Sequence, residues 1–362
     1  MNYAKLHKHL IALASLPKTD SPVVSAYLDF GDPARTAVTD FRRWAALTRQ
    51  TFTGQRRQDF DDAVEEVDSW LSDNRSRSAA VFARWGEHPL FIAMPFEVPL
   101  ENHFHVDAVP VIYPLVELKD RFNRFVVVLT TATSARIVEV NLGAQSVDLL
   151  TERPALRERI GREWTREHYM NHRRDRDRKF VKEKIAVIES LMAKRGHNSL
   201  VVAGDPRCVN RLVDALPAHL RERVVGQIKT GMTGGRLRDV IGQAVDSFLQ
   251  AEAEEAHDVV DLLVKAVRAG GLATVGVETT RRALIDGRVG QLVVSSALLH
   301  EEREELVRLA SRHDVPIETV QECEMLDRNG GAGALLRYTY PGDLIDTRRG
   351  GSGDGDPGSQ AA

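Results

Sequence analysis

ERPALRERIGREWTREHYMNHRRDRDRKFVKEKIA, residues 152–186, is the stretch around which the rest of the sequence is organised. Between Arg157 and Lys184 it carries eleven Lys and Arg residues and six Asp and Glu residues. The formal net charge of the whole chain is −3, so this positive excess is local. A local excess creates a positive potential that attracts polyanions, whatever the total charge of the molecule. Phosphate groups are therefore the first candidate partner.

The composition is that of a soluble globular protein, with 43% hydrophobic and 28% charged residues. A chain of 362 residues exceeds one hydrophobic core of ordinary size, so two or three domains are expected. Cys208 and Cys323 are the only cysteines, and they lie in different neighbourhoods. Two distant cysteines cannot build a disulfide framework or a four-ligand zinc site, so we expect a reducing, cytoplasmic setting.

Neither end of the sequence predicts a targeting segment. The apolar run from Leu10 to Leu16 is short for a signal peptide, and no small-residue cleavage motif follows it. It is better explained by an amphipathic helix that ends at Pro17. No window reaches membrane-spanning length. Residues 342–362 are rich in Gly, Ser and Asp, which predicts a disordered tail.

Residues 1–118 are predicted to form an N-terminal α/β domain. A strand, two helices and a hairpin are expected in this order, at residues 23–30, 38–53, 57–71, 79–85 and 89–94. The segment 106–118 is apolar but contains Pro110 and Pro114. Proline cannot donate a hydrogen bond within a sheet, so this segment is interpreted as an edge strand or a connector.

Residues 119–268 are predicted to form a middle domain in which strands and helices alternate. Three strands with short connections come first, and the basic stretch follows them. The predicted strands are at residues 125–130, 134–141, 145–150, 199–203 and 224–228, and the predicted helices are at 179–194, after Pro206, and at 237–268. Such alternation favours a mixed or parallel sheet covered by helices.

Residues 269–341 are predicted to form a compact C-terminal α/β sandwich of ordinary domain size. Its predicted helices are at residues 279–286 and 301–312, and its predicted strands are at 291–295, 317–320 and in LLRYTY, residues 335–340. The fold class expected for the whole chain is therefore α/β, with mixed sheets covered by helices.

Two parts of the sequence resemble a known family. GVETTRRALIDGRVGQLVVSS (276–296), VPIETVQ (315–321) and NGGAGALLRY (329–338) resemble the C-terminal domain of archaeal and eukaryotic class-1 release factors and of Pelota. HYMNHRRDRDRKFVKEKIAVIESL (168–191), followed by SLVVAGDPRCVNRLVDAL (199–216), is similar to the middle domain of that family in order and spacing. The resemblance covers residues 124–340 and implies a three-domain, release-factor-like architecture.

The sequence departs from that family at its functional motifs. A release factor of this type carries Gly-Gly-Gln in a loop before the basic helix, whereas here the corresponding residues 159–164 include one glycine and no glutamine. The motifs that read stop codons are also missing from the N-terminal segment. The chain therefore resembles the bacterial release-factor-like group that keeps the scaffold without the hydrolytic loop, which includes the ribosome-hibernation protein Balon.

The basic stretch supplies the candidate RNA-binding residues. Arg and Lys make charge-assisted contacts to phosphate that need no sequence code, and the resemblance places this stretch where the family faces the ribosome. The candidates are Arg162, Arg166, Arg173, Arg174, Arg176, Arg178, Lys179 and Lys182. A solvated helix face, on which these side chains pair with neighbouring Asp and Glu, is the alternative explanation.

Other motifs indicate structure rather than chemistry. His168 and His172 have the spacing of metal ligands, but no third ligand lies nearby in the sequence, so a surface pair is expected. The segment 231–235 lacks the lysine of a phosphate-binding loop, and the glycines of 330–333 precede a strand, so both are interpreted as turns or tight packing. Cys208 is expected in a core rather than as a nucleophile. No catalytic residue, metal site or cofactor site is predicted.

The resemblance implies a tRNA-shaped protein that occupies the A-site region of the ribosome during rescue, stress or hibernation, without peptide hydrolysis. Its expected partners are the ribosome, ribosomal RNA and an elongation-type GTPase, with no membrane or DNA partner. Two alternative hypotheses remain open from the sequence. One is a diverged peptidyl-tRNA hydrolase that uses a side chain near residues 161–165, and the other is a stress-associated interaction protein with no ribosome role.

Overall fold

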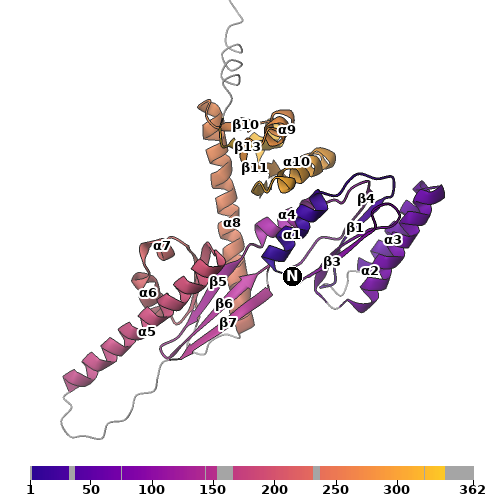
Figure 1. The fold of residues 1–362 in the computed structure, drawn as a ribbon. Coiled ribbons are helices and arrows are strands. Elements are labelled where there is room, and N and C mark those ends of the chain that lie inside the picture. The colour runs from indigo at the N-terminus through magenta and orange to yellow at the C-terminus, as the bar shows by residue number, and fades with distance from the viewer. Residues whose placement is uncertain are drawn as a thin grey trace, which may run out of the picture. The chain divides into compact units, whose positions relative to one another are not determined.

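The computed structural model describes residues 2–31, 37–74, 76–142, 144–152, 166–230, 237–321 and 323–338. These residues form three β-sheets with helices packed against them (Figure 1). They fall into two compact units, one drawn from residues 1–6, 21–106 and 121–253 and the other from residues 7–20, 107–120 and 254–362. The predicted α/β class with mixed sheets covered by helices is confirmed.

The first sheet has the strand order β3-β2-β1-β4. Its strands are β1 (Val23–Asp29), β2 (Ser78–Arg84), β3 (Leu90–Phe96) and β4 (His103–Asp107), and β1 is followed by α2 (Ala37–Thr48), the 3-10 helix η1 (Arg49–Thr51) and α3 (Gly54–Asp73). Alternate apolar residues of β1 and β2 pack against α2 and α3, because successive side chains of a strand point to opposite faces. The predicted strand, the two helices and the hairpin β2–β3 are confirmed.

The prediction of an edge strand or a connector for residues 106–118 is wrong from Tyr113 onward, although residues 106 and 107 belong to the edge strand β4. After β4 the chain forms α4 (Tyr113–Arg121). Pro114 is the second residue of this helix, where the missing N–H of proline interrupts no intrahelical hydrogen bond. The Glu304 carboxylate accepts hydrogen bonds from the backbone N–H groups of Ile112, at 2.8 Å, and Tyr113, at 2.9 Å. These bonds satisfy donors that every helix start leaves without an intrahelical partner, so here proline marks the beginning of a helix.

The middle sheet has the order β7-β6-β5-β8-β9. Its strands are β5 (Phe125–Thr130), β6 (Ser134–Asn141), β7 (Ala144–Glu152), β8 (Ser199–Gly204) and β9 (Val224–Lys229). The first three strands form an antiparallel meander, and β5, β8 and β9 run parallel to one another. The predicted meander and the predicted mixed sheet are both confirmed.

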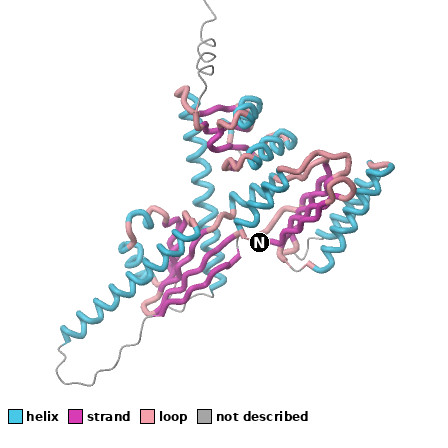
Figure 2. The backbone as a smooth tube through the Cα atoms, viewed as in Figure 1, coloured by secondary structure: helices cyan, strands magenta, loops and turns pink. Residues whose placement is uncertain are grey.

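Helices cover both faces of the middle sheet. One face packs against α5 (Arg166–Arg195), α6 (Pro206–Ala215) and α7 (Ala218–Arg221), and the other packs against the first part of α8 (Leu237–Arg268). The sequence of β5 explains this arrangement, because its apolar residues point alternately to the two cores. Phe125 stacks on Phe248 of α8 with ring centroids 4.4 Å apart. α5 and α8 are 30 and 32 residues long (Figure 2).

The third sheet has the order β10-β13-β11-β12. Its elements are β10 (Ala273–Val275), α9 (Val277–Ile285), β11 (Val289–Ser295), α10 (His300–Arg312), β12 (Ile317–Val320), α11 (Glu324–Arg328) and β13 (Ala332–Leu336). The sequence did not predict the short elements β10 and α11. Gly333 lies where an added Cβ would come 2.7 Å from a Leu263 methyl group of α8, so this glycine serves close packing, whereas Gly330 and Gly331 adopt positive φ values of 93° and 72° in the turn before β13.

The three sheets lie within the three ranges that the sequence assigned to domains, and we keep boundaries near residues 118, 268 and 341 as a proposal.

The predicted N-terminal helix is α1 (Tyr3–Ala14), with Leu6, Leu10 and Leu13 buried. The tail at 342–362 lies outside the described residues. In the ranges that the structure describes, no helix combines the length and the apolar character needed to cross a lipid bilayer.

Candidate functional site

From Arg166 onward, the basic stretch lies in α5. The helix contains no proline or glycine, and it ends where Gly196 adopts a positive φ of 64° and the His197 N–H donates to the carbonyl oxygen of Met192. A buried apolar stripe begins at Phe180 and includes Ile188 and Leu191. The sheet is therefore covered by the part of α5 from Phe180 onward, whereas residues 174–179 contribute no buried apolar side chain.

The structure places five of the eight candidate RNA-binding side chains. Arg174, Arg178, Lys179 and Lys182 are exposed, and Arg176 is half-buried. Arg166 and Arg173 belong to α5, although their side chains are not described, and Arg162 lies outside the described residues. The five described candidates gather at one place on the molecule, the surface between α5 and α6.

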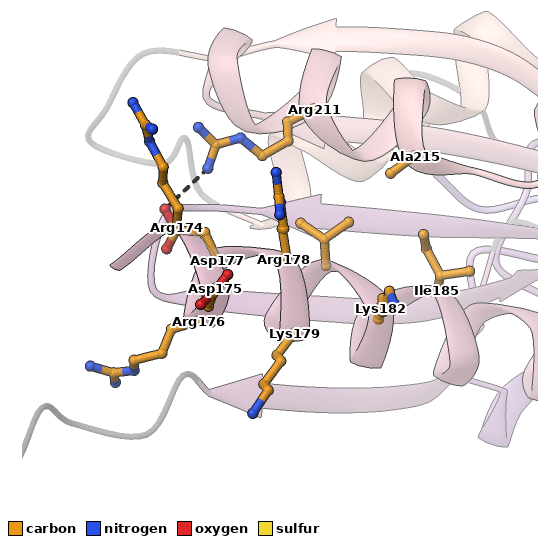
Figure 3. Close-up of a pocket in the computed structure, with 11 residues that line it drawn as sticks. Arg174, Asp175, Arg176, Asp177, Arg178, Lys179, Lys182, Ile185, Arg211 and Ala215 are labelled. Carbon is orange, nitrogen blue, oxygen red and sulfur yellow. Dashed lines mark hydrogen bonds and ion pairs between the residues drawn. The ribbon is translucent and has the colours of Figure 1, made fainter. Parts of the chain in front are cut away.

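A groove of about 790 Å³ runs between α5 and α6. We call it the α5–α6 groove, and its lining is Arg174, Asp175, Arg176, Asp177, Arg178, Lys179, Val181, Lys182, Ile185, Arg211 and Ala215 (Figure 3). Arg174, Arg178 and Lys182 are spaced by four residues and therefore follow one face of the helix. Figure 3 shows Arg174 and Arg178 on the side that faces Arg211, whereas Arg176 and Lys179 extend away from it.

The α5–α6 groove is strongly positive. Six cationic side chains and two carboxylates line it. Arg211 of α6 donates to Asp177 of α5, with 3.3 Å between Nη1 and Oδ2, so one cation is matched across the groove. The Arg211 side chain is 60% exposed, and exposed pairs of this kind contribute about 0–1 kcal/mol to stability. Such a weak pair can be exchanged for another anion at little cost.

Arg211 is a residue that the sequence did not single out. It lies 33 residues beyond Arg178, on a different helix, and it joins the groove because the apolar faces of α5 and α6 pack in one core. The sequence predicted both helices but not their packing. No local pattern around Arg211 distinguishes it from Arg207, which is also exposed on α6 but does not line the groove.

Lys184 belongs to the basic stretch in the sequence, but in the structure its side chain is buried. Its side chain is 3% exposed, and its ammonium donates to Thr130 Oγ1 at 2.7 Å and to the carbonyl oxygen of Thr131 at 3.3 Å. The same ammonium lies 4.0 Å from the centroid of the Phe180 ring. Lys184 therefore anchors α5 to the end of β5 and is not available to a polyanion.

Among the cysteine and histidine candidates around the groove, only Cys208 has a described side chain. Cys208 is half-buried at the start of α6, and burial raises the pKa of its thiol, which disfavours the nucleophilic thiolate. The side chains of His168 and His172 are not described, and residues 159–164 and 231–235 lie outside the described ranges. Among the residues that the structure describes, no three His, Cys, Asp or Glu side chains are placed to share a metal ion.

Comparison with known proteins identifies the segment that builds this groove. Residues 110–248 match the family model described as "Bacterial archaeo-eukaryotic release factor family 10". Residues 110–248 are release-factor-like. The matched residues include α4, the whole middle sheet, α5, α6 and the part of α8 that reaches Phe248, so the α5–α6 groove belongs to the release-factor-like segment. For the middle segment, the resemblance stated from the sequence is confirmed.

Solved structures of release factors and their relatives are similar to the chain at low identity. The archaeal translation termination factor aRF1 is 18% identical, with 93% of this chain and 99% of that chain covered and a TM-score of 0.29. A model of ribosome-bound archaeal Pelota and ABCE1 is 17% identical, with coverages of 93% and 94% and a TM-score of 0.45. Dom34 of S. cerevisiae, a translation termination-like factor, is 14% identical, with coverages of 74% and 82% and a TM-score of 0.42.

Proposed function

We propose that this protein is a ribosome-associated translation factor that occupies the A-site region during rescue, stress or hibernation and does not hydrolyse peptidyl-tRNA. The observation that carries the proposal is the position of the α5–α6 groove, a strongly cationic surface inside the segment that matches a release factor family. A surface with six cations and two carboxylates favours a polyanion. On a ribosome that polyanion is the phosphate backbone of RNA.

The mechanism that we propose is occupancy. Arg174, Arg178 and Lys182 bind phosphates along one face of α5, and such contacts fix the position and orientation of the protein without reading a sequence. The absence of Gly-Gly-Gln from residues 159–164 supports the view that no water is oriented for attack on the peptidyl ester. The resemblance to Pelota and class-1 release factors leads us to include an elongation-type GTPase as a partner in delivery.

Co-sedimentation of the full-length protein with ribosomes tests the proposal. If about five phosphates are contacted, the association constant falls as roughly the fourth power of salt concentration, or about 80-fold between 50 and 150 mM salt. Replacing Arg174 and Arg178 together by Gln is expected to lower the slope of log K against log salt by about two. The matched control replaces Lys194 and Arg207, two exposed cations of the same helices outside the groove, by Gln.

Peptide release from purified ribosomal complexes separates this proposal from its enzymatic alternative. An occupancy factor binds and releases no peptide above background, whereas a diverged hydrolase releases peptide in proportion to its concentration. No sedimentation with ribosomes at 50 mM salt would contradict the proposal and favour an interaction protein with no ribosome role.

A further inference from the structure

The α5–α6 groove has an apolar floor that phosphate binding does not require. Val181 and Ile185, one turn apart on α5, are half-buried, and Ala215 at the end of α6 is exposed beside them. The same two α5 side chains pack below against the core shared with α6. A surface that serves only the phosphates of a duplex needs exposed cations and no apolar recess. The recess therefore fits a ligand with an apolar, flat part as well as negative charge.

An unpaired nucleotide has both properties. Its base is planar and its phosphate is anionic, and proteins recognise unpaired RNA bases by stacking them on flat side chains, including arginine guanidinium groups. The groove volume of about 790 Å³ lies within the range of roughly 300–1,000 Å³ that is usual for small-ligand sites. Arg174, Arg178 and Arg211 supply planar cations at the rim.

An acidic peptide fits less well. An extended peptide brings backbone N–H and C=O groups that need hydrogen-bond partners, and the walls of this groove are two helices whose own backbone groups are already paired within each helix. A nucleotide base can lie on the apolar floor and keep its polar edge toward water. The charge and the floor together favour the nucleotide.

We propose that the α5–α6 groove holds one unpaired nucleotide of an RNA strand, with the base against Val181 and Ile185 and the phosphate on Arg178 and Arg211. This inference rests on the proposed ribosomal function and specifies its RNA ligand. In the free protein, Arg211 Nη1 lies 3.3 Å from Asp177 Oδ2. On binding, this ion pair breaks, and the phosphate takes the place of the Asp177 carboxylate beside Arg211. The base contacts that we propose are to Val181 and Ile185, whose side chains have no hydrogen-bonding groups, so the site accepts any of the four bases.

Fluorescence anisotropy with the full-length protein and a labelled single-stranded RNA of about eight nucleotides tests the inference. Three probes are compared at one salt concentration: the single strand, the same strand with abasic sites, and its duplex. Loss of the base contact with Val181 and Ile185 is expected to weaken binding on the order of tenfold, so both other probes bind more weakly than the single strand. Equal affinity for the three probes would overturn the inference, as would complete displacement of the RNA by an acidic peptide at lower concentration.

Two pairs of variants locate the ligand. Arg211→Glu reverses a charge inside the groove and is expected to weaken RNA binding at least tenfold, whereas Arg207→Glu makes the same change on the same helix outside it. Ala215→Gln fills the groove without changing charge and is expected to remove the preference for the single strand over the abasic strand. Ala186→Gln adds the same bulk at an exposed position of α5 that does not line the groove. If the members of each pair behave alike, the groove is not the binding site.

The two proposals fail in different ways. Ribosome co-sedimentation without any discrimination among the three RNA probes overturns the nucleotide site and leaves the ribosomal function in place. Discrimination among the probes without ribosome co-sedimentation overturns the ribosomal function on which the inference rests.

Discussion

Glu304 offers a quantitative test of the corrected structure around α4. Its carboxyl group is buried on α10, and burial raises its pKa to about 7 although two backbone N–H groups donate to it. In the unfolded chain the same group ionises near pH 4.5. Between these two values the folded state binds more protons than the unfolded state, so stability falls as the pH rises from 4.5 to 7 and then levels off.

The size of this effect follows from the two pKa values. The difference between 4.5 and about 7 corresponds to about 3 kcal/mol in the free energy of unfolding. Glu304→Gln keeps a carbonyl oxygen to accept from the start of α4 but cannot ionise, so this share of the pH dependence disappears. Asp120 and Glu318, whose pKa values burial raises to about 6 and about 8, act in the same direction and keep their contribution in the variant.

The assay is hydrogen exchange of the α4 amides, measured by mass spectrometry from pH 5 to pH 8 and corrected for the intrinsic pH dependence of exchange. Protection of α4 is expected to fall with rising pH in the natural sequence and to fall much less in Glu304→Gln. Glu301→Gln is the matched control, because Glu301 is an exposed residue of the same helix. An unchanged pH dependence in Glu304→Gln would refute the reasoning that this buried carboxyl holds the start of α4.

Three further predictions concern the two units separately. Lys184→Met removes the ammonium that bonds Thr130 and is expected to lower the stability of the middle sheet by about 1–3 kcal/mol, measured by urea unfolding. Burial lowers the pKa of His197, which lies 3.1 Å from Glu139, so the neutral imidazole is favoured in the fold and the melting temperature is expected to fall as the pH drops below about 6.5. His197→Gln should flatten that fall. Gly333→Ala puts a methyl group 2.7 Å from a leucine methyl group of α8 and is expected to lower the free energy of unfolding by about 1–3 kcal/mol, measured by thermal unfolding. The control is Gly287→Ala, whose added methyl group meets no atom within 4 Å, so that variant measures only the cost of a positive φ.

Much of the fold follows from local patterns in the sequence. The apolar run of β5 predicted a strand, and the structure places its alternate residues in two cores. The spacing of apolar residues on the second half of α5 likewise predicted the face that meets the sheet. Lys184 lies four residues from both Phe180 and Ile188, so the same periodicity indicates that its side chain is buried. A count of the charges in the stretch does not show this.

The missed features depend on contacts between distant residues. α4 was missed because Pro110 and Pro114 were interpreted as marks of an edge strand or a connector. The group that supports the helix start, Glu304, lies 190 residues beyond Pro114 in the chain. Arg211 was missed because its place beside α5 depends on the packing of two helices. The basic stretch was predicted to bind phosphate, but only the packing of α6 turns it into a groove with an apolar floor.

A cryo-EM map of the protein bound to ribosomes would show directly whether the α5–α6 groove binds ribosomal RNA. We expect the protein in the A-site region with this groove against ribosomal RNA, Arg174 and Arg178 within contact distance of phosphates, and an intact peptidyl-tRNA beside it. If α5 and α6 instead face solvent in the bound state, the proposed function is wrong.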